Sequence, residues 1–241
     1  MATNQEILNK IEECLTESYT RSDTTVIPKK GDLTFGNTVK RIPHAKVFYI
    51  DMRKSRKILS DSSSFWSVKI HKAFLGAVTH CIEKREGHLR SFNGDGLLAF
   101  FIGENAASRA VRAALDIKGF VLEINKILKD YEINPIDCGI GIAQGTIDVA
   151  KSGKSGDDQT KQDLIWIGPP LYLAVELSEL GKSPESIWIS HNVRSSIGKE
   201  NCLNVVNDAK TGKSMWAKYE KELKSVGKYD VRATTYHSVF K

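Results

Sequence analysis

The sequence lacks the features that would place a protein in a membrane or outside the cell. No apolar stretch among its 241 residues approaches the ~20 residues that span a bilayer. The polar, acidic N-terminal segment MATNQEILNKIEE does not have the pattern of a signal peptide. The 4 cysteines are far apart and form no CxxC pair or Cys/His cluster, which argues against a zinc site and against a disulfide framework. We therefore expect a soluble, cytoplasmic protein without a membrane span.

The sequence also lacks the usual marks of nucleic-acid binding and of two common enzyme classes. The net charge is +6, but no run of five basic residues and no basic helix with interleaved aromatics occurs, so we expect no nucleic-acid partner. The stretches SGKS at 152–155 and TGKS at 211–214 lack the upstream glycine of a P-loop. No G-x-S-x-G motif of a serine hydrolase is present.

What the sequence does contain is the pattern of one α+β unit. A hydrophobic fraction of 41% and a charged fraction of 27% are ordinary for a globular protein. Apolar periodicity predicts helices over 4–17, 63–85, 104–128, 170–181 and 191–198. Strands are predicted over 45–52, 88–92, 97–102, 138–149 (a glycine-dotted strand pair), 163–167, 187–190 and 229–240.

These elements predict an N-terminal helix and connector over residues 1–44, followed by one domain over 45–241. The order β-α-β-β-α-β with additions is typical of the ferredoxin-like arrangement, an antiparallel sheet with helices on one face.

Two aspartates stand at notable places in this order. Asp51 ends the first predicted strand of the domain, and Asp95 lies in the Asn-Gly-Asp-Gly turn of the predicted hairpin. A lone aspartate in a turn is usually a turn residue. The first strand and the hairpin are neighbours in such a sheet, however, so the two carboxylates are expected to converge. Paired carboxylates suit Mg²⁺ or Mn²⁺ held against phosphates, and two such ions can assist phosphoryl transfer.

Five segments in this order resemble the class III nucleotidyl cyclases, and together they cover about residues 45–190. They are VFYIDMRKS, LRSFNGDGLLAFF, ENAASRAVRAALDI, CGIGIAQGTIDVAKSG and DLIWIGPPLYLAVELSELGK. The resemblance implies the ferredoxin-like class III cyclase fold. It also implies a phosphorus–oxygen lyase that joins the 3′-hydroxyl of a nucleoside triphosphate to its α-phosphate and releases pyrophosphate. The family works as a head-to-tail homodimer with active sites at the subunit interface.

The resemblance implies roles for particular residues as well. Asp51 and Asp95 would be catalytic ligands of two Mn²⁺ or Mg²⁺ ions, with the backbone of Met52 as a further ligand. Main-chain N–H groups of Met52, Arg53, Lys54, Ser55 and Arg56 would cradle the triphosphate, as helix starts do for anions. The base and ribose pocket is expected to contain Phe48, Ser91, Asn93, Ile165, Trp166 and Tyr172.

The base-reading positions depart from those of the purine cyclases. Where adenylyl and guanylyl cyclases carry Lys or Glu, this sequence has Ser91, and where they carry Asp or Cys it has Ile165. Donor and acceptor identity decides base selectivity, so we predict that this is not an ordinary adenylate or guanylate cyclase. Trp166 and Tyr172 supply bulk that suits a smaller base.

Three further departures affect the ribose and the transition state. Tyr172 replaces an Asn that positions the ribose, Glu176 replaces an Arg that stabilises the transition state, and Gly139 replaces an Arg. Losing such a cation costs orders of magnitude in rate unless another group replaces it. Arg53, Lys54, Arg56 and Lys228 are the candidates.

Two hypotheses follow. The sequence is similar to the pyrimidine cyclases of the bacterial Pycsar anti-phage systems, whose cyclic nucleotide activates a partner effector during infection. This predicts a cyclase that converts UTP to 3′,5′-cyclic UMP, with CTP to cyclic CMP as the alternative. The second hypothesis is a domain that has lost catalysis and only binds a nucleotide or a partner. Retention of both Asp51 and Asp95 argues against it.

Overall fold

The computed structural model describes residues 3–61, 63–156, 158–200, 205–208 and 210–240. Its helices are α1 (Asn4–Thr16), α2 (Ser55–Asp61), α3 (Ser64–Lys84), α4 (Ala106–Asp130), α5 (Pro169–Leu180) and α6 (His191–Lys199), with short 3-10 turns η1 (Lys30–Asp32) and η2 (Gln159–Lys161). Its strands are β1 (Thr20–Asp23), β2 (Thr38–Arg53), β3 (His88–Asn93), β4 (Gly96–Phe101), β5 (Asp137–Gly153), β6 (Gln162–Ile167), β7 (Ile187–Ser190), β8 (Ala217–Leu223) and β9 (Gly227–Thr234).

All the strands join one sheet in the order β3-β4-β2-β5-β7-β9-β8, while β1 pairs with β2 and β6 pairs with β5. The predicted β-α-β-β-α-β order is present. The sheet is mixed rather than purely antiparallel, because β7 runs parallel to β5 and β1 runs parallel to β2. The chain crosses from β5 and β6 to β7 through α5, which is the connection that a parallel pair requires.

Helices cover both faces of the sheet, not one face as predicted. Helices α3, α4 and α6 pack on one face, around a core that includes Phe74 and Phe101. Helix α5 packs on the other face, where Ala174 and Leu177 are buried. The glycines of β5 explain this close packing, since a Cβ atom at Gly141 would collide with the carbonyl oxygen of Ala174. The glycine-dotted sequence therefore marks the strand that α5 covers.

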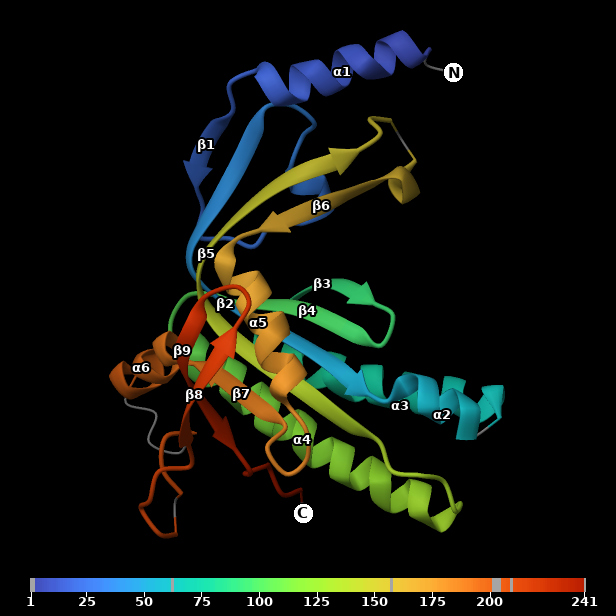
Figure 1. Cartoon of the computed structure of the whole chain (residues 1–241), viewed down its shortest axis with the longest axis vertical. Coiled ribbons are helices and arrows are strands. Elements are labelled where there is room, and N and C mark those ends of the chain that lie inside the picture. The colour runs from blue at the N-terminus through green and yellow to red at the C-terminus, as the bar shows by residue number, and fades with distance from the viewer. Residues whose placement is uncertain (1–2, 62, 157, 201–204, 209, 241) are drawn as a thin grey trace.

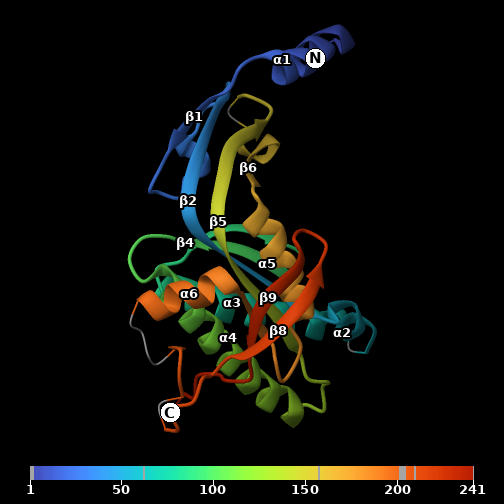
Figure 2. The ribbon, with the colours of Figure 1, turned by 60° about the vertical axis from the view of Figure 1, so that its left-hand side comes forward.

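An arm rises from the body and consists of the outer halves of β2 and β5 flanked by β1 and β6, with α1 across its tip (Figures 1 and 2). The sequence analysis did not predict this arm. Strand β2 is sixteen residues long and begins before the predicted strand at 45–52, and β5 is one continuous strand rather than a pair. Residues 18–44 are more than a connector, because Ile27 and Leu33 are buried beneath the arm. Arg90 of β3 fixes this segment by donating to the carbonyl oxygens of Ile27 and Pro28.

Two further elements were not predicted from the sequence. Helix α2 follows β2 after a single residue, Lys54, in the left-handed conformation (φ 57°). Strand β8 forms a hairpin with β9, which ends at Thr234 rather than at residue 240. Within the part of the chain that the structure describes, no helix combines the length and the apolar character needed to cross a bilayer.

Candidate active site

The carboxylates of Asp51 and Asp95 lie close together at one end of the sheet. Asp51 is near the end of β2, which is hydrogen-bonded to β4, and Asp95 lies in the β3–β4 turn directly before Gly96. Asp51 Oδ1 is 3.3 Å from the position that a Cβ atom on Gly96 would occupy. Burial raises the pKa of Asp51, and the negative charge of Asp95 raises it further. A glycine at position 96 thus leaves open the space beside the Asp51 carboxylate.

Two residues that the sequence analysis did not single out belong to the same cluster. The Tyr49 hydroxyl oxygen is 2.8 Å from the same Cβ position on Gly96. Burial raises the pKa of Tyr49, the charge of Asp51 adds to this, and a hydrogen bond with Asn93 opposes it. Glu179 of α5 raises the pKa values of both Tyr49 and Asp51 through its charge. Strand alternation was the available signal, since Tyr49 precedes Asp51 by two residues and shares its face.

Arg53 partly offsets this negative charge. Its Nη1 lies 3.5 Å from Asp51 Oδ2, and its charge lowers the pKa of Asp51. Its Nε donates to the carbonyl oxygen of Gly181 at 2.8 Å, and its Nη2 donates to that of Ser178. These carbonyls belong to the C-terminal end of α5, where a cation is favourable. The guanidinium group is therefore held in place beside the carboxylate pair.

The two carboxylates suit a hard divalent cation only if other oxygens complete its coordination. Among the described residues, no group of three or more His, Cys, Asp and Glu side chains is arranged to hold a metal ion. Mg²⁺ is commonly bound by one or two carboxylates together with substrate phosphates. Asp51 and Asp95 fit such a site, in which the ion and the triphosphate bind together.

A cleft of about 700 Å³ opens at this end of the sheet, and five of its seven charged residues are basic. Its charged lining comprises Arg53, Lys54, Lys57, Lys118, Asp137, Glu179 and Lys182. The Nζ of Lys118 donates to the carbonyl oxygens of Pro184 and Thr235, so this side chain has a structural role. Burial lowers the pKa of Lys118. Lys54 and Lys182 are exposed. Neither Asp51 nor Asp95 lines the cleft, but Arg53, which lies 3.5 Å from Asp51, does. The basic side chains supply the charge that phosphates require.

The loop predicted to cradle the triphosphate runs from the end of β2 into α2. The side chain of Met52 is buried in the core, while Lys54 and Arg56 are exposed and Ser55 is half-buried. The N–H groups of Lys57 and Ile58 donate to the carbonyl oxygen of Lys54. Only the first N–H groups of α2 are therefore left for an anion, because they have no partner within the helix.

The predicted base-pocket residues are not all brought together within one chain. Asn93 lies beside Tyr49, and Ser91 is on the same strand. Ile165 pairs with Ala150, eleven residues along β5 from Gly139, the partner of Asp51. At about 3.3 Å per residue, that separation is roughly 35 Å. One chain therefore does not place Ile165 next to its own carboxylate pair.

The side chains of the remaining predicted pocket residues point in different directions. Ile165 and Tyr172 are exposed, at 44% and 57%. Trp166 is half-buried and packs on Phe100, with ring centroids 4.5 Å apart. Phe48 does not line the site, contrary to the prediction, because its side chain is fully buried and packs against Phe101 on the opposite face from Asp51. The nearby aromatic on the Asp51 face is Tyr49.

Glu176, at the position where a catalytic Arg was expected, has a structural contact. Its carboxylate accepts hydrogen bonds from Ser225 N at 3.0 Å and from Ser225 Oγ at 2.9 Å. Ser225 lies in the β8–β9 turn, so Glu176 holds this turn against α5. The turn, which contains Lys224 and precedes Lys228 of β9, is thereby positioned beside α5.

Sequence comparison finds two uridylate cyclases that are similar to most of this chain. The chain is 28% identical over 194 residues to a uridylate cyclase of Burkholderia cepacia, covering 78% of this chain and 82% of the relative. It is 31% identical over 192 residues to a uridylate cyclase of Xanthomonas perforans, covering 77% of each. No family model matches the chain.

Solved structures give the same fold at lower sequence identity. The adenylyl cyclase CyaB from P. aeruginosa superposes with a TM-score of 0.66 at 19% identity, over 81% of this chain and 95% of that one. The guanylyl cyclase Cya2 superposes with a TM-score of 0.67 at 19% identity, over 82% of this chain and 94% of that one. The predicted cyclase-type α+β fold is thereby confirmed.

Proposed function

The chain belongs to the family of its uridylate cyclase relatives, within the class III nucleotidyl cyclases, and from this premise we propose that it converts UTP to 3′,5′-cyclic UMP and pyrophosphate. It is accordingly a nucleotidyl cyclase, a phosphorus–oxygen lyase that binds a nucleoside triphosphate. The observation that carries the proposal is the carboxylate pair of Asp51 and Asp95, together with Arg53, which lies beside Asp51 and also lines a cleft with basic side chains.

In the proposed reaction the ribose 3′-hydroxyl loses its proton to water and its oxygen attacks the α-phosphorus. The new bond joins that oxygen to phosphorus, the bond to the bridging oxygen of the β-phosphate breaks, and pyrophosphate leaves. Asp51 and Asp95, with the backbone of Met52, would hold two Mn²⁺ or Mg²⁺ ions. Such ions lower the pKa of the hydroxyl and neutralise the phosphates. Arg53, fixed beside Asp51, limits the repulsion between the carboxylates and the incoming phosphates.

The phosphates are assigned to the loop of residues 52–56 and to the cleft beside it. Lys54, between β2 and α2, and Lys57, in the first turn of α2, both line this cleft. A point charge on a lysine is a common phosphate partner, and main-chain N–H groups at a helix start add further donors.

The active site is proposed to form between two copies of the chain. Ile165 lies roughly 35 Å along β5 from the partner of Asp51, whereas Asp51 and Asp95 lie together. A head-to-tail homodimer would bring Ile165 and Tyr172 of one copy to the carboxylates of the other. Symmetric dimers of this kind are the commonest soluble oligomers.

Pyrimidine selectivity is supported by the chemistry of the base positions. Ser91 and Ile165 supply neither the Lys nor the acidic partner with which purine cyclases read a base edge. Tyr172 is exposed and bulky, which reduces the space available to a purine. UTP is favoured because the relatives are uridylate cyclases. CTP is the alternative, since the sequence does not distinguish the two pyrimidines.

From the resemblance to the anti-phage cyclases we also propose a role in defence against phage. Cyclic UMP made in the cytoplasm would act on an effector that responds to the cyclic nucleotide, and the signal would arise during infection.

The test uses the full chain and its Asp95→Ala variant with UTP and Mn²⁺. The wild-type protein should release cyclic UMP and pyrophosphate in equal amounts, identified by mass spectrometry. The variant should release neither while retaining the circular dichroism spectrum of the wild type. Equal activity of the two proteins would refute the role of the carboxylate pair.

A further inference from the structure

Helix α1 exposes an apolar stripe that no other described residue of the chain covers. Ile7, Leu8, Ile11 and Leu15 recur at helical spacing and are 47%, 57%, 51% and 81% exposed, and no residue of α1 is buried. The helix has thirteen residues and a capping box at Thr3. An isolated helix of this length is marginal in water, and most helical stability in proteins comes from packing of an apolar face. We therefore expect this apolar stripe to pack against a partner surface.

A groove of matching character lies on the body, between α3 and the edge strand β3. Its volume is about 630 Å³, and its apolar lining includes Val68, Leu75 and Phe92. Val68 and Phe92 are 57% and 59% exposed. Gly76 also lines the groove, and a Cβ atom added there would contact nothing within 4 Å. The groove is open along one helix face and is suited to receive another helix.

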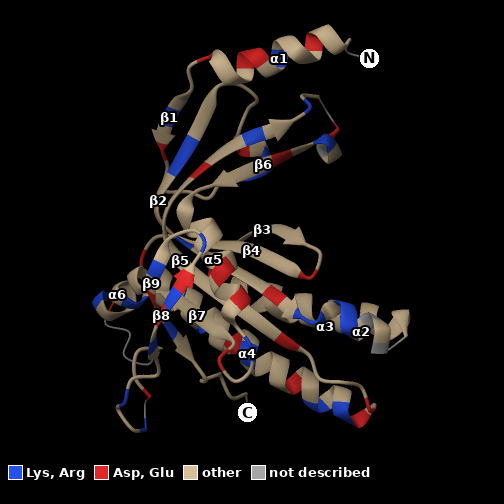
Figure 3. Cartoon of the chain, viewed as in Figure 1, with Lys and Arg blue, Asp and Glu red and all other residues tan. Residues whose placement is uncertain are grey.

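The charges of the two surfaces are complementary. Helix α1 carries Glu6, Glu12 and Glu13 against the single basic residue Lys10. The groove is bordered by Lys72 and His71, and Lys69 lies on the same helix, stacked over the Phe65 and Trp66 rings. Figure 3 shows this contrast between acidic residues on α1 and basic residues on α2 and α3. Opposite charges at the rim of an apolar contact fix its orientation and exclude wrong partners.

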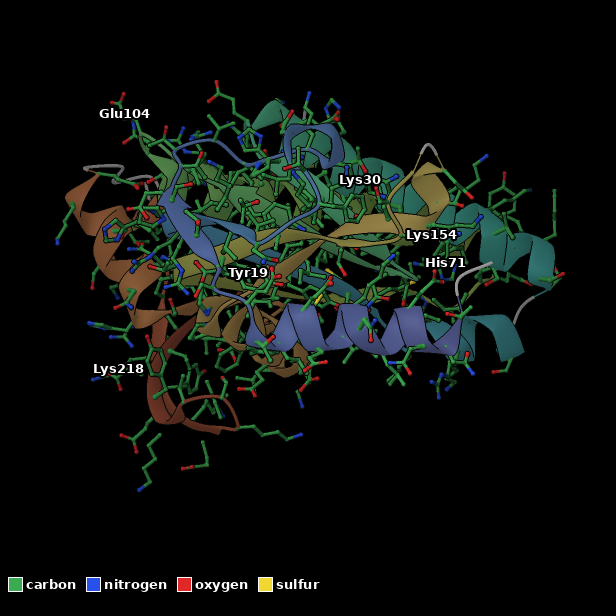
Figure 4. All side chains as sticks on the ribbon, turned by 90° about the horizontal axis from the view of Figure 1, so that it is seen from above. Tyr19, Lys30, His71, Glu104, Lys154 and Lys218 are labelled. Carbon is green, nitrogen blue, oxygen red and sulfur yellow. The ribbon has the colours of Figure 1, made fainter. Side chains whose placement is uncertain are left out.

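The groove and the helix of one chain cannot meet. Helix α1 lies across the tip of the arm, whereas α3 lies in the body, and both ribbon views show them apart (Figures 1 and 2). Figure 4 looks down on α1 and labels His71 of the groove on α3. The occupant of the groove must then come from a second molecule, and a second copy of this chain supplies a helix of the right character.

We propose that α1 of one copy docks into the α3–β3 groove of the other, so that a homodimer contains two reciprocal contacts of this kind. Phe92 lies in the groove and Asn93, its neighbour on β3, lies in the Tyr49–Asp51 cluster. The docked helix thus packs on the strand that leads to Asp95, and links dimer formation to the position of this turn. The proposal rests on the homodimer of the proposed function but not on its substrate.

The native thiol of Cys14 provides a direct test. Cys14 is exposed on α1 and borders the stripe, three residues after Ile11. Cys81 and Cys138 are buried, and burial raises the pKa of each thiol to about 12, so neither will compete. Val68→Cys and Lys72→Cys are introduced separately into a protein that also carries Cys202→Ser. Each variant is oxidised mildly and run on a non-reducing gel. Lys129→Cys, exposed at the far end of α4, is the matched control.

The expected result is a covalent dimer with Val68→Cys or Lys72→Cys that disappears when Cys14→Ser is added. Lys129→Cys should give none. Peptide mapping should find the Cys14 disulfide joined to the introduced cysteine. Three results would overturn the proposal: no covalent dimer from a protein that sediments as a dimer, a Cys14–Cys14 disulfide in the parent, or a disulfide within one chain.

A second measurement uses no introduced cysteine. Leu8→Asp with Ile11→Asp should weaken dimerisation, measured by sedimentation velocity, by about tenfold or more, because two apolar anchors are lost at each contact. The near-UV circular dichroism spectrum should be unchanged, since no residue of α1 is buried in its own chain. An unchanged dimer dissociation constant would contradict the docking. Cyclic UMP formation is assayed in parallel, and its presence without crosslinking would reject the α1 contact while leaving the cyclase assignment intact.

Discussion

The guanidinium group of Arg53 fills the space above Gly139 on the neighbouring strand. A Cβ atom at position 139 would collide with Arg53 Nη2 and with the carbonyl oxygen of Ser178. The purine cyclases that this chain resembles carry an Arg at the position of Gly139. Here the strand partner β2 supplies a cation to the same place, beside Asp51. We infer that loss of the side chain at 139 and the orientation of Arg53 depend on each other.

The first prediction concerns this pair. Gly139→Ala should lower the free energy of unfolding by about 1–3 kcal/mol in urea denaturation, because overpacking forces Arg53 and α5 to move. Gly198→Ala on α6 is the control, since its Cβ would meet only the Arg194 guanidinium at 3.5 Å. It should be neutral or stabilising, as alanine replaces glycine within a helix. Equal stability of the Gly139→Ala protein and the wild type would show that Arg53 is not confined there.

The second prediction concerns the pH dependence of the metal-free protein. The pKa of Asp51 is raised by burial and by Asp95. A raised folded-state pKa means that stability is greatest below the unfolded pKa and is lost as the pH rises through the folded value. Asp51→Asn should therefore raise the melting temperature at pH 7, with a gain that shrinks towards pH 4. Mn²⁺ added together with 3′-deoxy-UTP, which cannot cyclise, should stabilise the wild type more than the variant, because the ion binds with the triphosphate. A variant that melts below the wild type at pH 7 without metal contradicts the repulsion between the carboxylates.

The third prediction tests the division of the active site between two copies. Asp95→Ala and Tyr172→Ala should each be nearly inactive alone. Mixed in equal amounts and allowed to exchange subunits, they should recover about a quarter of wild-type activity, because half of the dimers are mixed and each then has one intact site. Asp95→Ala mixed with Asp51→Ala is the control, since both changes fall in the same half. No recovery in the first mixture would place the whole site within one chain.

The fourth prediction concerns the β8–β9 turn. Glu176→Ala removes the acceptors of the Ser225 hydrogen bonds and should cost roughly 0.5–1.5 kcal/mol in urea denaturation. Ser225→Ala removes only the hydroxyl donor and should cost less. If Glu176 acted on the substrate instead, its loss would reduce turnover without any change in stability.

The sequence allowed much of the body to be predicted, for identifiable reasons. Strand β7 was predicted with its observed bounds because a short apolar run lies between clear breaks. Helices α3 and α4 were predicted to within two residues at each end, since their apolar periodicity is long. The arm could not be predicted, because β2 begins among polar residues whose pairing is with distant strands: Thr38 pairs with Thr20 of β1, and Lys40 pairs with Val149 of β5.

The residues of the candidate site likewise divide into those that the sequence predicted and those that it did not. Asp51 and Asp95 stood out because motif order and strand adjacency coincide. Tyr49 was missed in favour of Phe48, although strand alternation places Tyr49 on the face of Asp51. The contacts of Arg53 and Glu176 depend on where α5 ends and on the β8–β9 turn, neither of which has a local sequence signal.

The most direct test of the account is a competition among substrates. The full chain is incubated with equal concentrations of ATP, GTP, CTP and UTP and with Mn²⁺, and every cyclic product is measured by mass. The account predicts cyclic UMP as the main product, with none from Asp51→Ala or Asp95→Ala. Cyclic AMP or cyclic GMP as the main product, or no cyclic product at all, would contradict it.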